Sequence, residues 1–172
     1  ESCVQYLAEK GVPSLVGVVG IDELMPTQQR ERIMKGLGDS KVVDASSLYR
    51  SLRMIKPLRE QDQIRRAARV CKEALGGMVG QRFPDITERQ IEAFLFREAR
   101  LQGAEDIRVL LGIPKKSPWA LHPATDKNIE PGNTLIIYLA AAYERYWAES
   151  IRTFLTEKNG LVSSKMEENE VF

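Results

Sequence analysis

This 172-residue sequence has few of the residues that build metal centres or disulfide frameworks. It has two cysteines, Cys3 and Cys71, and a single histidine, His122. One isolated pair of cysteines predicts reduced thiols in a cytoplasmic protein, and neither a disulfide framework nor a zinc site. A lone histidine excludes a histidine-rich metal centre within these residues. Cys71 falls on the apolar stripe of an expected helix, which favours a small buried hydrophobic residue.

The sequence also lacks a surplus of one charge and any long hydrophobic run. Lys and Arg total 25 against 24 Asp and Glu, a formal net charge of +1, whereas nucleic-acid binders usually carry a basic excess. The longest apolar run, residues 135–143, has the length of a strand, and a membrane helix needs about 18 apolar residues. The N-terminus shows no basic segment followed by an apolar one. We therefore expect no nucleic-acid partner, no membrane partner and no secretory signal.

The first part of the chain alternates between helical and extended patterns. The expected elements are a helix over Ser2–Lys10, a buried strand over Ser14–Gly20, a helix from Pro26 to Leu37 and a second strand over Lys41–Ala45. This order is typical of an α/β domain with parallel strand pairing. Two strands are too few for a self-sufficient sheet, so residues 1–53 are interpreted as the tail of an α/β N-terminal domain.

A long amphipathic helix dominates the next part. Ser46 is expected to cap a short helix that runs to about Met54, and Pro57 interrupts the helical pattern. The long helix is predicted over residues 60–79, with Arg65, Arg66, Arg69 and Lys72 on a solvated face. Its apolar stripe is Ile64, Ala67, Ala68, Cys71, Leu75 and Met78.

The remaining residues predict a helix followed by antiparallel strands. Thr87 and Gln90 form a capping box for a helix that buries Ile91, Phe94, Leu95 and Ala99 and ends at Gly103. Strands are expected over residues 107–112, 134–143 and 146–156, the last two joined by a tight turn at residues 144–145. The middle strand is expected to be covered on both faces. The last dozen residues are acidic and are expected to be loosely ordered. The predicted class is α/β (α+β), with helices packed on a mainly antiparallel sheet.

Four segments, in order along the chain, resemble the creatinase, prolidase and aminopeptidase P family, which has the pita-bread fold. They are DASSLYRSLRMIKPLREQDQIRRAARVCKEAL (44–75), TERQIEAFL (87–95), ALHPATDKNIEPGNTLII (120–137) and YERYWAESIRTF (143–154). The resemblance implies the C-terminal part of a creatinase-type N-terminal domain over 1–53 and the N-terminal half of a pita-bread domain over 54–172. The sequence begins at Glu1 and not at Met, so we expect a piece of a longer protein.

The family's usual chemistry is metal-assisted hydrolysis. Two divalent ions, of the Mn, Co or Zn type, are held by two Asp, one His and two Glu and activate a water. The resemblance places the two Asp at Tyr138 and Glu149, and neither is Asp. A phenol with a pKa near 10 is a poor substitute for a carboxylate, and the usual Gly of the turn is Arg145. The other three ligands would lie beyond Phe172. We therefore expect a degenerate metal site and no cofactor on this chain.

The resemblance also marks residues that would contact a ligand. His122 matches the family's substrate-side histidine, and the alternative is a loop histidine that supports the turn at Pro123. Arg152 matches the Arg of the family's hairpin, where it would line the site or serve the structure. Tyr143, Tyr146 and Trp147 form either a packing cluster or a ligand cage, and packing is the favoured interpretation.

Three functions stay open at this point. The first is a noncatalytic module that binds a peptide or protein ligand in the old cleft, by analogy with noncatalytic users of the fold. The second is a functional metal-dependent Xaa-Pro peptidase or creatinase-type hydrolase, completed by residues absent from this chain. The third is a scaffold or dimerisation domain. A homodimer is expected, because members of the family are often homodimers.

Overall fold

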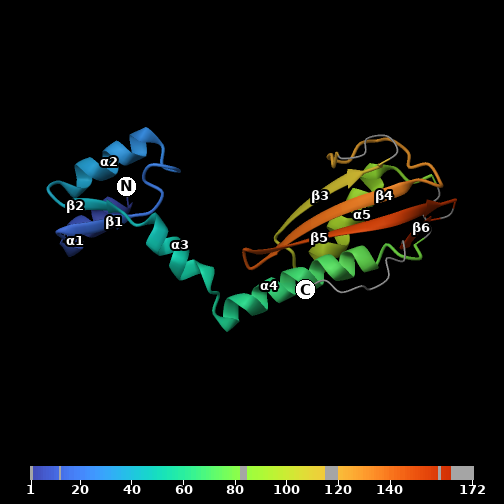
Figure 1. The fold of residues 1–172 in the computed structure, drawn as a ribbon, viewed down its shortest axis with the longest axis horizontal. Helices are drawn as coiled ribbons and strands as arrows, with labels where there is room; N and C mark the ends of the chain where they lie inside the picture. Colours follow the sequence, from blue (N-terminus) through green and yellow to red (C-terminus); the bar gives the residue numbers. More distant parts are fainter. Residues whose placement is uncertain (1, 12, 82–84, 115–119, 159, 164–172) are drawn as a thin grey trace. The chain divides into compact units, whose positions relative to one another are not determined.

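The computed structural model describes residues 2–11, 13–81, 85–114, 120–158 and 160–163 (Figure 1). The chain forms two compact units, Glu1–Lys56 and Pro57–Phe172. Each unit has its own sheet. In the described ranges, no helix is long and apolar enough to cross a membrane.

The first unit has a two-stranded parallel sheet, as the alternating pattern predicted. Strands β1 (Leu15–Val18) and β2 (Lys41–Asp44) pair side by side. The helices are α1 (Ser2–Lys10), α2 (Thr27–Leu37) and α3 (Ser46–Met54). The prediction that β1 is buried is wrong, because Leu15 is 56% exposed. Two strands offer too little surface for a strand to be enclosed on both faces.

Ser46 has a role that differs from the expected helix cap. The N-cap position of α3 is Ala45, and no side-chain cap is formed there. The buried Ser46 hydroxyl instead accepts a hydrogen bond from the Gly20 amide at 2.8 Å and donates one to the Asp44 carboxylate at 2.5 Å. Ser46 therefore connects the turn after β1 to the end of β2. The two hydrogen bonds also offset the cost of burying the hydroxyl.

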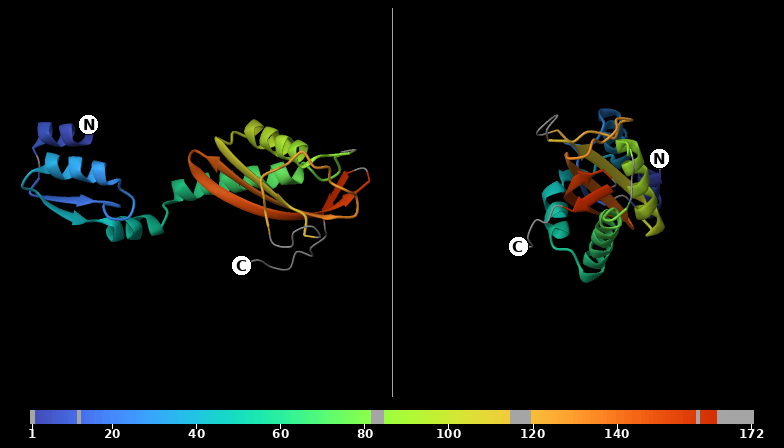
Figure 2. Two further views of the ribbon diagram at one scale, coloured as in Figure 1. Left: turned by 90° about the horizontal axis from the view of Figure 1, so that it is seen from above. Right: turned by 90° about the vertical axis from the view of Figure 1, so that its right-hand side faces the viewer.

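The second unit is an antiparallel sheet in the order β3-β4-β5-β6, with two helices on one face (Figure 2). The strands are β3 (Asp106–Gly112), β4 (Thr134–Tyr143), β5 (Tyr146–Glu157) and β6 (Gly160–Ser163). The helices are α4 (Leu58–Gly76) and α5 (Glu88–Leu101). The sequence pattern did not predict β6. Residues 164–172, part of the tail expected to be loosely ordered, lie outside the described residues.

Helix α4 buries a stripe that is rotated from the predicted one. Four predicted members are buried: Ala67, Cys71, Leu75 and Met78. Ala68 is exposed and Ile64 is half-buried, whereas Val70 and Ala74 are buried in their place. The helix packs on both β4 and β5, and contact with two strands brings positions 70 and 74 against the sheet.

Helix α5 begins as predicted. The Thr87 hydroxyl accepts from the Gln90 amide at 3.2 Å, and the Gln90 side chain accepts from the Thr87 amide at 2.9 Å. This reciprocal capping box satisfies amides that the first turn of a helix leaves unpaired. Ile91, Leu95 and Ala99 are buried in the core, whereas Phe94 is only partly buried.

The β4–β5 hairpin sets the register of the sheet. Its turn residues Glu144 and Arg145 have φ of 46° and 68°, as a type I′ turn requires. Tyr143 pairs with Tyr146, and the register continues to Thr134 and Leu155. The prediction that β4 is covered on both faces along its length is wrong, because Ile136 and Tyr138 are only half-buried.

Candidate functional site

The two faces of the second sheet differ in what covers them. Side chains alternate between the faces along each strand, and paired residues of neighbouring strands share a face. Helices α4 and α5 cover the face that carries Leu111, Ile137 and Leu139 (Figure 2). We call the opposite face the Tyr138 face. Its side chains include Arg108, Leu110, Ile136, Tyr138, Trp147, Glu149 and Ile151.

Tyr138 and Glu149 are diagonal neighbours on this face. Tyr138 pairs with Ile151, and Glu149 pairs with Ala140, so the two side chains lie on adjacent strands two positions apart in register. Burial raises the pKa of the Tyr138 phenol above its ordinary value, and the hydrogen bond to the Glu149 carboxylate and its negative charge raise it further. The phenol therefore keeps its proton at neutral pH, and its O–H donates a hydrogen bond to the Glu149 carboxylate.

Arg108 also belongs to the Tyr138 face, and the sequence analysis did not identify it. It pairs with Ala140 across β3 and β4, and its guanidinium carbon lies 5.4 Å from the centre of the Trp147 ring. Its positive charge acts on Tyr138, where it partly opposes the rise in the phenol's pKa. Ala140 is fully buried, so the larger side chains around it close over this part of the sheet.

These groups do not fit the two-metal centre that the family resemblance implies. A protonated phenol is a poor ligand, and the cation of Arg108 beside Tyr138 opposes the binding of a dication. Among the residues that the structure describes, no three His, Cys, Asp or Glu side chains gather as a metal-binding group. Asp106 also belongs to this face, because it pairs with Ala142, but it lies four positions from Tyr138 in register, whereas Glu149 is a diagonal neighbour of Tyr138.

His122 lies beside the edge strand β3, on the face of the sheet opposite to the Tyr138 face. Its backbone bonds to Leu111 in both directions at 2.9 Å, so its side chain shares the helix-covered face with Leu111. Nδ1 lies 2.9 Å from the Pro123 carbonyl, and Nε2 lies 3.8 Å from the Glu88 carboxylate. The structure thus does not bring His122 to Tyr138 and Glu149.

Glu88, the first residue of α5, was also missed by the sequence analysis. Its side chain is buried, and one oxygen accepts from the Thr125 amide at 2.9 Å and from the Thr125 hydroxyl at 2.7 Å. The Glu88 amide donates to the Lys127 carbonyl. Glu88 therefore fastens the loop that carries His122 to the start of α5. A Thr-Glu pair at a helix start was the available signal, but its partner 37 residues later was not readable.

The other predicted site residues are dispersed. Arg145 is in the hairpin turn, where its amide donates to the Glu105 carboxylate at 2.9 Å. Arg152 pairs with Ile137 and so lies on the opposite face from Tyr138. The aromatic cluster is divided in the same way, because Trp147 is on the Tyr138 face and the paired residues Tyr143 and Tyr146 are not.

Cys71 is buried, as the sequence predicted, and lies on α4. Its thiol is positioned to donate to the Ala148 carbonyl at 3.5 Å. Burial raises the pKa of the thiol, and the charge of Glu149 adds to the rise. Cys71 is therefore a neutral packing residue at the β4–β5 ladder.

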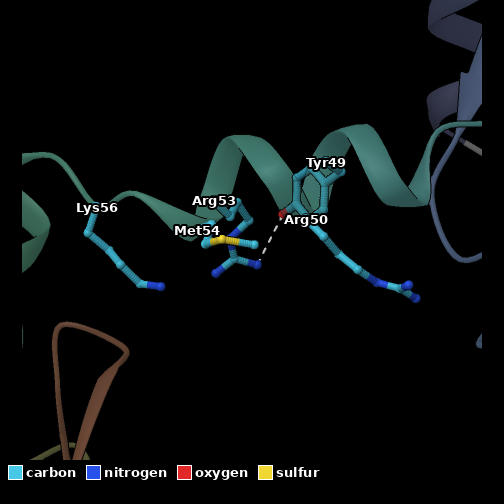
Figure 3. A pocket seen from close by; sticks show the side chains of 5 residues that line it. All are labelled: Tyr49, Arg50, Arg53, Met54 and Lys56. Atoms are coloured by element: carbon cyan, nitrogen blue, oxygen red, sulfur yellow. Dashed lines mark hydrogen bonds between the residues drawn. The ribbon is translucent and has the colours of Figure 1, made fainter.

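Two surface hollows lie outside the Tyr138 face. One, of about 290 Å³, is bordered by Tyr49, Arg50, Arg53, Met54 and Lys56 (Figure 3). In it Arg53 donates to the Tyr49 hydroxyl at 3.2 Å, and Arg50 is ion-paired with Glu23. The other, of about 260 Å³, lies between α4, the end of α5 and the end of β4.

Comparison with known proteins places this geometry in a family. Residues 62–170 match the model of metallopeptidase family M24. An Xaa-Pro dipeptidase from Pyrococcus horikoshii is 26% identical over 154 residues, which cover 87% of this chain and 42% of the relative. The chain thus spans less than half the length of this curated relative.

Solved structures agree with this assignment. An X-Pro aminopeptidase from Thermotoga maritima superposes with a TM-score of 0.72 at 26% identity, over 88% of this chain and 43% of that one. A prolidase from Pyrococcus horikoshii superposes with a TM-score of 0.74 at 20% identity, over 90% of this chain and 44% of the other. The expected fold class is confirmed, and the chain belongs to metallopeptidase family M24.

Proposed function

We propose that this chain is a noncatalytic member of its family that binds a peptide or protein segment on the Tyr138 face. The supporting observation is the Tyr138–Glu149 pair. At the two positions that the resemblance assigns to metal-binding Asp, a protonated phenol donates to a carboxylate. Arg108 supplies the positive charge beside this pair.

The ligand is argued from the apolar side chains of the same face. Ile151 is 58% exposed and Trp147 is 39% exposed, and clustered exposed apolar groups are typical of a binding surface. The names of the relatives, Xaa-Pro dipeptidase and X-Pro aminopeptidase, point to peptides as the class of ligand. His122 shares the helix-covered face with Leu111, so it lies outside the proposed surface, as do Arg145 and Arg152.

A metal-dependent Xaa-Pro peptidase, completed by residues outside this chain, is the second candidate. Membership of a metallopeptidase family favours it, and Glu149 keeps a carboxylate at one ligand position. Both candidates share a proposed assignment of residues 1–53 to a creatinase-type N-terminal domain and 54–172 to a half pita-bread domain. Both also share a proposed cytoplasmic homodimer, for which sedimentation equilibrium gives the mass directly.

Hydrolysis and binding assays separate the two candidates. The longest natural form of the protein is incubated with the dipeptides Ala-Pro and Leu-Pro in Mn²⁺, Co²⁺ or Zn²⁺. We expect no release of proline above a metal-only blank, and calorimetric binding of the dipeptides that persists in EDTA. Release of proline that EDTA abolishes would establish the peptidase instead, and absence of both binding and hydrolysis would contradict a peptide ligand.

A pair of variants locates the binding surface. Ile151→Asp places a carboxylate among the exposed apolar groups of the Tyr138 face, and we expect dipeptide affinity to fall by about tenfold or more. Leu101→Asp is the matched control, because Leu101 is also exposed but lies at the end of α5. Equal losses in the two variants would mean that the ligand does not bind to the Tyr138 face.

A further inference from the structure

The hollow of about 260 Å³ on the helix-covered side of the second unit is lined by two arginines. Arg66, Arg69 and Val70 come from α4, Gln102 follows α5, and Tyr143 ends β4. Tyr143 and Tyr138 are an odd number of residues apart on β4, so their side chains lie on opposite faces of the sheet. The hollow is therefore separate from the proposed peptide surface. Among the described residues, no carboxylate lines it.

Arg66 is held in place at one wall of the hollow. One of its terminal nitrogens donates to the Tyr143 hydroxyl at 3.2 Å, and its guanidinium carbon lies 5.6 Å from the centre of the Tyr143 ring. A guanidinium has five N–H donors in a rigid planar arrangement. The contact with Tyr143 uses one of them and fixes the orientation of the others.

Arg69 lies three residues further along α4, on the same side of the helix as Arg66. Over the ranges that the structure describes, it has no ion pair and no side-chain hydrogen bond. The neighbouring Arg65 differs, because it is paired with Asp62 at 2.7 Å and bonded to Gln61 at 3.2 Å. The basic face of α4 is therefore not uniform. Arg65 has an acidic partner, whereas Arg66 and Arg69 line one hollow that has no carboxylate among its described lining residues.

We propose that this hollow binds a phosphate-type oxyanion between Arg66 and Arg69. Two like charges at this helical spacing repel each other, and a dianion between them removes the repulsion. Guanidinium groups bind phosphate oxygens through paired, charge-assisted hydrogen bonds, and the Gln102 amide is a further donor. The volume of about 260 Å³ is just below the roughly 300–1,000 Å³ of drug-sized ligand sites, so the hollow has room for a free phosphate ion or for the phosphoryl group of a small ester.

The test is calorimetric titration of the protein with inorganic phosphate, at constant ionic strength set with sodium chloride. Arg69→Gln removes a charged donor from the hollow, and we expect affinity to fall about tenfold or more. Arg65→Gln is the matched control, because it removes the same charge from the same helix at an exposed position, and we expect affinity within about twofold of the parent. Tyr143→Phe removes the hydroxyl that holds Arg66 and gives an intermediate loss.

Three outcomes would overturn the proposal. The first is no measurable phosphate binding by the parent protein. The second is an equal loss of phosphate affinity in Arg69→Gln and Arg65→Gln. The third is phosphate binding that chloride suppresses equally in every variant, and this third result indicates an adventitious ion only. Thermal unfolding of each variant shows whether it remains folded. Phenyl phosphate distinguishes the two sources: tighter binding than that of inorganic phosphate indicates a phosphoryl group on a larger molecule, and equal or weaker binding indicates the free ion.

Discussion

The buried carboxylate of Glu88 offers a sharp test of how the second unit is held together. Glu88 is 2% exposed, and one of its oxygens accepts both hydrogen bonds from Thr125, while the other faces His122 Nε2 at 3.8 Å. The residue is the first of α5, where the helix dipole favours a negative charge. Glu88→Gln keeps the shape of the side chain and removes only its charge.

The expected loss follows from these contacts. A hydrogen bond to a charged group contributes about 1.5–3 kcal/mol and one between neutral groups about 0.5–1.5 kcal/mol, so neutralising the acceptor of two bonds costs about 2 kcal/mol. The interaction with the first turn of the helix adds about 0.3–1 kcal/mol. We therefore expect Glu88→Gln to lower the free energy of unfolding by about 2–3 kcal/mol. Glu88→Ala leaves the donors of Thr125 without a partner and costs more.

Urea denaturation monitored by circular dichroism measures this loss. Glu92→Gln is the matched control, because Glu92 lies one turn further along α5, and we expect a change of at most about 0.5 kcal/mol. A loss below about 0.5 kcal/mol in Glu88→Gln would refute the assignment of the carboxylate as the fastening of the 120–130 loop.

Three further predictions concern the hairpin and its neighbours. The pKa of Tyr138 is raised in the folded state, so the unfolded chain loses the phenol proton at a lower pH than the folded chain does. The stability that the phenol contributes is therefore present below about pH 10 and is lost above it. Urea denaturation should show that the free energy of unfolding falls more steeply above about pH 10 in the parent than in Tyr138→Phe. Arg145 has a φ of 68°, so Arg145→Gly should raise the free energy of unfolding by about 0.5–1 kcal/mol, and no gain in a urea titration would mean that the turn is not strained. Cys71 is buried with a raised pKa, so in a Cys3→Ser background a thiol reagent should label it roughly 100-fold more slowly in native buffer than in urea; equal rates would show that the thiol is accessible.

Local sequence signals predicted much of the secondary structure. The capping box at Thr87, the break at Pro57 and the two-residue turn at 144–145 depend on neighbouring residues, and each lies where the pattern placed it. The apolar stripe of α4 was predicted less accurately, because the choice between Ala68 and Val70 depends on which strands the helix covers. The short strand β6 has no distinctive pattern, and it forms because β5 offers an edge with which to pair.

Within the candidate site, the sequence predicted the proximity of two residues only where both belong to one short hairpin. Tyr138 and Glu149 lie on adjacent strands joined by a two-residue turn, so their eleven-residue spacing places them close together. Arg108 belongs to a strand some thirty residues earlier in the chain, and its register against β4 depends on packing over the whole sheet. The position of His122 on the opposite face has the same origin, because it depends on pairing with Leu111.

The most direct test of the central claim is a calorimetric titration with Mn²⁺ of the parent protein and of the double variant Tyr138→Asp with Glu149→Asp. We expect no specific Mn²⁺ binding by the parent and an affinity at least about tenfold higher in the double variant, because two carboxylates replace the phenol–carboxylate pair. Thr134→Asp with Glu149→Asp is the control, with its carboxylate four residues away on the same strand, about 13 Å along β4. Tight Mn²⁺ binding by the parent, or no gain in the double variant over this control, would contradict the account.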